Sequence, residues 1–181
     1  MLSGARVRMT LVLVVGLVVQ TSIVPHIGYH GRILDVMLLL AVAAGMVGGP
    51  ENGATVGFFA GVGTDLVVQT PFGMWALAGT LTGYGVGMVY GSFIGSGRLF
   101  RWITVAMALA VGTVTFVVVG RLIGQEFLAD VDLVPVVATV SLGGTILSPL
   151  AMKAVAWGYG MDRLPWDTGR RRRTARAQDH R

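Results

Sequence analysis

Cysteine is absent from this sequence, and charged residues are scarce. The lack of Cys among the 181 residues excludes disulfide bonds, thiolate metal sites and cysteine nucleophiles. Charged residues make up 13% of the chain, against about a quarter in soluble domains. Hydrophobic residues make up 54%, and the mean hydropathy is +0.71. This composition indicates a membrane protein.

Sequence motifs of catalysis are also missing. We find no phosphate-binding loop, no nucleophile paired with a base and no cluster of metal ligands. The stretch 83–87, G-Y-G-V-G, lies inside an apolar run, so it is not a dinucleotide fingerprint. We therefore expect a protein that is not an enzyme and that holds no cofactor and no metal.

Glycine is abundant, with 27 residues, and it recurs at every fourth position in two neighbouring apolar segments. These two glycine ladders are Gly53, Gly57 and Gly61 followed by Asp65, and Gly79, Gly83, Gly87, Gly91 and Gly95. Glycine weakens a helix in water, but G-x-x-x-G in a membrane lets two helix backbones approach closely. The ladders predict a tightly packed helix pair. It either closes the protein's own bundle or receives a helix from a partner.

Apolar runs long enough to approach or cross a bilayer set the expected architecture. A membrane-spanning helix needs roughly 17–25 residues. The candidate segments are 9–25, 33–48, 53–70, 74–95, 101–123 and 133–158. Short connections at 48–52 and 70–73 predict tight helical hairpins. We expect an all-α bundle of six transmembrane helices that occupies residues 1–165.

Basic residues gather on one side of this six-helix arrangement. They precede the first segment, join the fourth to the fifth and follow the sixth, so the positive-inside rule places both termini in the cytoplasm. Six of the fourteen Lys and Arg residues occupy the last twelve positions. We expect residues 166–181 to form a basic, disordered cytoplasmic tail. Beside a membrane exit, such a tail is typical of contact with anionic lipid and not with nucleic acid.

Asp65 is the acid inside the first glycine ladder. Spacings of four place Gly57, Gly61 and Asp65 on nearly one helix face. One hypothesis makes Asp65 an ion or proton relay, a ligand contact or a polar partner for another subunit. The other makes it a carboxylate that fixes helix register through hydrogen bonds to backbone groups or nearby polar side chains. The side chains that could serve are Thr64, Gln69, Thr80 and Thr82. We favour a packing or assembly role, and we interpret Asp35 and Glu51 as helix caps.

The stretch from Asp35 to Gly87 resembles the MreD family, the rod shape-determining membrane proteins of bacteria. The most specific match is G-F-x-x-G-x-x-x-D, which comprises Gly57, Phe58, Gly61 and Asp65. The P-F-G turn from Pro71 to Gly73 follows it. The resemblance marks these residues, with Gly79, Gly83 and Gly87, as helix-packing or partner-binding positions.

This resemblance implies a non-catalytic scaffold in the bacterial cell membrane that supports rod shape and lateral peptidoglycan synthesis. The implied partners are an MreC-type protein and the elongation machinery: MreB, a RodA-type glycosyltransferase and a class B penicillin-binding protein. The MreD bundle also looks like the S components of vitamin transporters. The alternative function is therefore a small-molecule-binding subunit of that kind.

Overall fold

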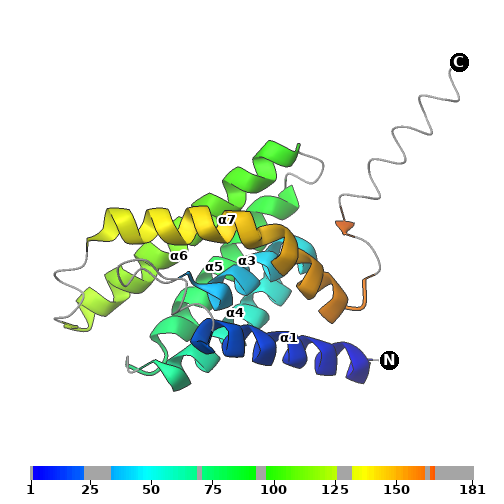
Figure 1. Cartoon of the computed structure of the whole chain (residues 1–181), viewed down its shortest axis with the longest axis horizontal. Coiled ribbons are helices and arrows are strands. Elements are labelled where there is room, and N and C mark those ends of the chain that lie inside the picture. Colours follow the sequence, from blue (N-terminus) through cyan, green and yellow to red (C-terminus); the bar gives the residue numbers. More distant parts are fainter. Residues whose placement is uncertain are drawn as a thin grey trace, which may run out of the picture.

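The computed structural model describes residues 2–22, 34–68, 71–92, 97–125, 132–161 and 164–165, and within them every regular element is a helix. The helices are α1 (Leu2–Ser22), α3 (Val36–Gly48), α4 (Pro50–Val67), α5 (Met74–Ser92), α6 (Arg98–Leu122) and α7 (Leu133–Gly158) (Figure 1). The all-α prediction is confirmed for this part of the chain. The predicted tail at 166–181 lies outside the described residues.

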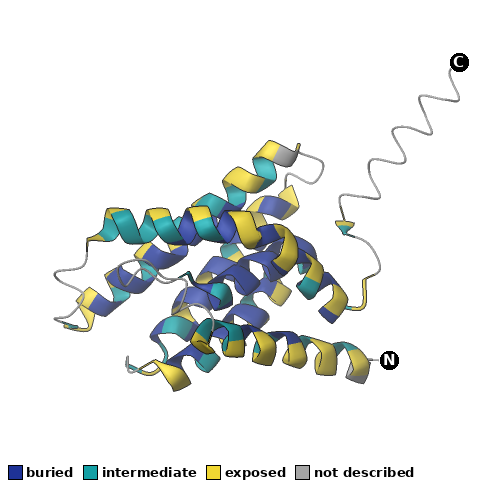
Figure 2. Ribbon diagram, viewed as in Figure 1, coloured by how far each residue is buried: buried dark blue, intermediate teal, exposed yellow. Residues whose placement is uncertain are grey.

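Helix α3 forms the centre of the molecule, and the other helices surround it (Figure 2). All its residues from Met37 to Val47 are buried. The helix begins at a true cap, because the Asp35 carboxylate accepts a hydrogen bond from the Leu38 amide at 2.8 Å. The Val36 amide donates to the Gln20 side chain of α1 at 2.6 Å. The predicted capping role of Asp35 is confirmed.

The connection between α3 and α4 is shorter than the sequence suggested. Only Gly49 interrupts the two helices, with φ +85°, and Pro50 already begins α4. Proline suits the first position of a helix because its fixed φ matches the helix and its missing N–H needs no partner there. The predicted tight hairpin is confirmed, but its connection is Gly49 alone and not 48–52, and the prediction of a Glu51 cap is wrong. Glu51 lies exposed in the first turn of α4, whose cap position belongs to Gly49.

Helices α6 and α7 lie together along one side of α3 and α5 (Figure 1). Leu109 of α6 is fully buried and reaches the backbone of Gly144 in α7. Pro149 lies inside α7, where the Ser148 hydroxyl donates to the Thr145 carbonyl at 2.7 Å. At the end of α7, Tyr159 packs against Gly48. Burial raises the pKa of Tyr159 to about 12, so its phenol stays neutral.

Among the described residues, three helices are long and apolar enough to cross a membrane: Gly4–Ser22, Leu99–Leu122 and Leu133–Gly158. Helix α3 has 13 residues, which is shorter than a span of about 20 residues. Helices α4 and α5 have 18 and 19 residues, but neither is among the three helices. Large hydrophobic side chains such as Val14, Val18, Leu142 and Ile146 face outward, as lipid contact would require.

Candidate functional site

The two glycine ladders meet along the interface between α4 and α5, which we name the glycine seam. A Cβ added to Gly57 would fall on the carbonyl oxygen of Gly79, and one added to Gly53 would fall on that of Gly83. The approach is reciprocal, because Cβ atoms on Gly79 and Gly83 would meet the carbonyls of Gly57 and Gly53. The two backbones are therefore in direct contact, as G-x-x-x-G packing predicts.

The seam extends beyond these two pairs and includes the central helix. Gly61 lies against the backbone of Trp75 and Ala76, and Gly87 lies against Gly49 and Pro50. From α3, Gly45 approaches the backbone of Gly83 in the same way. The chain's own helices thus pack against six glycines of the two ladders: Gly53, Gly57, Gly61, Gly79, Gly83 and Gly87. An added Cβ at Gly91 would meet nothing within 4 Å, and Gly95 lies outside the described residues. The structure therefore contains the first of the two predicted alternatives, in which the ladders close the protein's own bundle.

Asp65 lies at the end of the seam that is next to the turn between α4 and α5. It is 6% exposed, and its carboxylate accepts hydrogen bonds from three backbone amides at the start of α5 and in the residue just before it. Gly73 N–H and Ala76 N–H donate to Oδ2 at 3.0 and 3.1 Å, and Trp75 N–H donates to Oδ1 at 3.1 Å. Gly73 occupies the cap position of α5, and the amides of Trp75 and Ala76 belong to its first turn, which has no intrahelical acceptors for them. Asp65 therefore acts as the N-terminal cap of α5 from a position on α4.

This cap resolves the choice of hydrogen-bond partners for Asp65. The hydroxyls of Thr64 and Thr80 donate to carbonyls of their own helices, at 3.1 and 2.6 Å. Thr82 makes no hydrogen bond through its side chain, and Gln69 lies outside the described residues. The predicted hydroxyl partners are wrong, and the backbone partners are right. A carboxylate also suits this position because the N-terminus of a helix carries partial positive charge.

The P-F-G turn supplies the geometry that brings α5 to Asp65. Gly73 has φ +100°, which side chains with a Cβ rarely adopt. Pro71 is half-buried, and its carbonyl accepts from the Met74 amide at 3.3 Å. Phe72 is exposed and makes no contribution to the seam. The turn therefore positions the amides of α5 and takes no part in the core.

Replacement of Gly73 by alanine tests the turn through backbone strain alone. An added Cβ would meet nothing within 4 Å, so no steric clash complicates the result. We expect a loss of about 1–2 kcal/mol in unfolding free energy, since residues with a Cβ disfavour positive φ. The measurement is unfolding of the full chain in mild detergent, with Phe72→Ala as the matched control. Equal stability of the two variants would contradict this role of the turn.

Of the aromatic residues near the seam, Trp75 packs against another helix and Phe58 faces the surface. Trp75 stacks on Phe116 of α6 with ring centroids 3.9 Å apart, which ties the start of α5 to α6. Phe58 is 47% exposed, and its ring meets Phe59 edge-on at 5.5 Å. Phe58 therefore points away from the seam that its neighbour Gly57 enters. The Trp75 contact had no signal in the sequence, because the two aromatic residues are 41 positions apart.

The described residues contain no group of three His, Cys, Asp or Glu that could hold a metal ion. The two acids nearest the core, Asp35 and Asp65, both accept hydrogen bonds from helix amides. The chemistry of the site is thus that of helix capping and close backbone packing. No family model, no curated protein and no solved structure matches the chain at a significant level.

Proposed function

We propose that the protein is a non-catalytic, MreD-like scaffold in the bacterial cell membrane. It would support rod shape and lateral peptidoglycan synthesis through an MreC-type partner and the elongation machinery. The observation that carries the proposal is the different burial of the residues within the motif G-F-x-x-G-x-x-x-D. Its small and acidic residues are buried in the seam, and its aromatic residue is exposed. A rigid core with an outward aromatic side chain suits a docking protein.

The proposal includes a six-span arrangement with both termini in the cytoplasm. Three helices satisfy the length and hydropathy of a span by themselves. The glycine-rich helices α4 and α5 would enter the membrane as one closely packed pair with α3. Their backbone amides and carbonyls are paired within the helices, which a lipid environment requires.

The alternative function, a small-molecule-binding subunit, has less support. Three grooves among the described residues are lined almost entirely by apolar side chains. A pocket for a vitamin would need several polar groups that converge on the ligand. Asp35 and Asp65, two of the few candidates, already accept hydrogen bonds from helix amides. We therefore favour the scaffold.

Phe58 provides the direct test of this function. Because the seam glycines are buried, a partner must contact the outer face of the α4–α5 pair or another surface. We expect Phe58→Ala to reduce co-purification of the MreC-type partner at least fivefold, the effect of losing an anchor worth about 1 kcal/mol or more. The chain itself should remain folded, since this side chain is half-exposed.

Leu142→Ala is the matched control, because Leu142 is also exposed but lies on α7. It should leave co-purification unchanged. If the wild-type chain retains no MreC-type protein from cell membranes, the proposed function is wrong. If the partner binds but Phe58→Ala and Leu142→Ala behave alike, the docking face lies elsewhere.

A further inference from the structure

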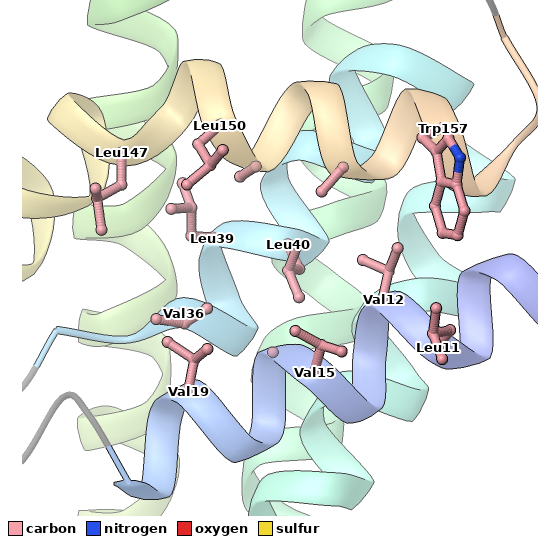
Figure 3. Close-up of a pocket in the computed structure, with 13 residues that line it drawn as sticks. Leu11, Val12, Val15, Val19, Val36, Leu39, Leu40, Leu147, Leu150 and Trp157 are labelled. Carbon is pink, nitrogen blue, oxygen red and sulfur yellow. The ribbon is translucent and has the colours of Figure 1, made fainter.

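An apolar groove runs between α1 and α7, and α3 forms its floor (Figure 3). Its volume is about 380 Å³. Leu11 and Val15 line it from α1, Leu40 from α3, and Leu150 and Trp157 from α7. Figure 3 shows these side chains turned toward one another across the gap between the helices. The groove is separate from the glycine seam and plays no part in the proposed scaffold function.

One end of the groove carries a positive charge. The Arg8 guanidinium lies over the Trp157 ring, 5.7 Å from its centroid. Lys153 lies exposed one turn earlier on α7. Neither cation pairs with a carboxylate within the part of the chain that the structure describes. The groove therefore combines a long apolar wall with positive charge at one end.

The shape of the groove distinguishes between possible occupants. Met9 of α1 meets Gly158 of α7, with the Met9 methyl group 3.0 Å from the position of an added Cβ. On the floor, Gly16 of α1 lies against the Leu40 side chain. A helix with side chains is about 10–12 Å across, so it would have to separate these contacts. A flexible hydrocarbon chain fits without moving them.

We propose that this groove binds an anionic phospholipid, with one acyl chain between α1 and α7 and the phosphate beside Arg8. The acyl chain is already shielded from water in the bilayer, so the apolar lining holds it through van der Waals packing. The charge at the Trp157 end selects an anionic headgroup, and tryptophan is typical of the depth at which headgroups lie. This proposal rests on the membrane location of the chain and is independent of any role in the cell wall.

The test measures lipid retention by native mass spectrometry of the full chain released from detergent. The probes are dioleoyl phosphatidylglycerol and dioleoyl phosphatidylcholine, which share acyl chains and differ in net charge. We expect about fivefold more retention of phosphatidylglycerol, the factor that one basic residue near an anionic surface supplies. Arg8→Gln should remove this preference, whereas Arg6→Gln, which loses the same charge from the same helix, should preserve it.

A second pair of variants tests the acyl-chain part of the groove. Val15→Trp fills the groove, and Val14→Trp adds the same bulk at a neighbouring position that does not line it; both side chains are about half exposed. We expect Val15→Trp to reduce retention of both lipids and Val14→Trp to change neither. If Val15→Trp does not fold, Leu150→Trp fills the opposite wall at an exposed position.

Three results would overturn the proposal. The first is equal retention of the two lipids by the wild-type chain. The second is the same response to Arg8→Gln and Arg6→Gln, which would indicate a general effect of net charge. The third is a photoreactive residue at position 15 that crosslinks to a protein instead of a lipid in cell membranes. That result would identify the occupant as a partner helix.

Discussion

Gly83→Ala should unfold the α4–α5 pair, whereas Gly85→Ala, two residues along the same helix, should leave it intact. A Cβ at position 83 would meet the carbonyl group of Gly53, which is backbone and cannot rotate away. A Cβ at position 85 would meet nothing within 4 Å. Overpacking of a core costs about 1–3 kcal/mol. We expect about 3 kcal/mol or more here, because the helices themselves must separate.

Both variants replace glycine by alanine in α5 and add the same volume. The gain in helix propensity is therefore the same in both and does not affect the comparison of their stabilities. Alanine is the better helix former by about 1 kcal/mol, and Gly85→Ala should therefore be neutral or stabilising. The measurement is the thermal unfolding midpoint of the full chain in mild detergent, followed by size-exclusion chromatography. Similar midpoints for the two variants would show that the backbones are not in contact at Gly83.

The seam also changes how substitutions at Gly57 and Gly61 are interpreted. Because both glycines contact backbone of α5, a leucine at either position would disrupt the fold before it affected any partner. Loss of a complex in such variants would therefore say nothing about docking. Exposed positions such as Phe58 separate the two effects, since their replacement leaves the seam unchanged.

Asp65→Ala is the second substitution for which we expect a large effect. It would leave the amides of Gly73, Trp75 and Ala76 without acceptors at a mostly buried position. Each unpaired buried amide costs about 1–3 kcal/mol, so we expect a total of about 3 kcal/mol or more. The expected result is a strongly lowered unfolding midpoint and a loss of the closed α4–α5 hairpin.

Asp65→Asn separates hydrogen bonding from size. The asparagine side chain keeps one acceptor oxygen, but its NH₂ group would face amide donors at the other position. Oδ2 of Asp65 accepts two of the three hydrogen bonds. In either orientation of the asparagine amide, its NH₂ group would therefore face at least one backbone N–H donor. We expect Asp65→Asn to lose most of the stability that Asp65→Ala loses. Wild-type stability in Asp65→Asn would contradict the capping role.

Asp35→Ala offers a comparison within the same protein. Asp35 caps its own helix with one hydrogen bond, to the Leu38 amide. Loss of a single N-cap costs about 1 kcal/mol, so this variant should be less affected than Asp65→Ala. The ranking of the two variants, measured under identical detergent conditions, tests whether the extra amides at Asp65 matter.

The helices were largely predictable, because hydrophobic runs and helix breakers are local properties of a chain. The run at 133–158 coincides with α7, and the run at 74–95 begins with α5 at Met74 and ends at residues outside the described part of the chain. The first run was placed too late, since α1 begins at Leu2 and passes through Arg6 and Arg8 without interruption. The sequence predicted a turn at Pro50, but this residue begins α4. Proline occurs both in turns and at the first position of a helix, so its presence alone does not distinguish the two.

The site was predictable in outline and not in its contacts. Spacing of four placed Asp65 on the face of Gly57 and Gly61, and all three are buried in α4. Backbone groups were among its predicted hydrogen-bond partners, but the three particular amides were not identified, because backbone amides are present at every residue and leave no mark in a sequence. The pairing of Trp75 with Phe116 and the groove beside Trp157 were missed as well, since they join segments distant along the chain.

The sequence by itself determined the helical class of this protein, its apolar character and the faces on which glycine allows close approach. Those features depend on composition and on local periodicity, which a single chain displays directly. Only the tertiary structure decided which backbones meet at the glycines, and that Asp65 caps the helix after its own. It also decided that Phe58 faces outward while Gly57 is buried. Such contacts depend on how whole helices cross, and neither the spacing nor the composition of one helix specifies its neighbour.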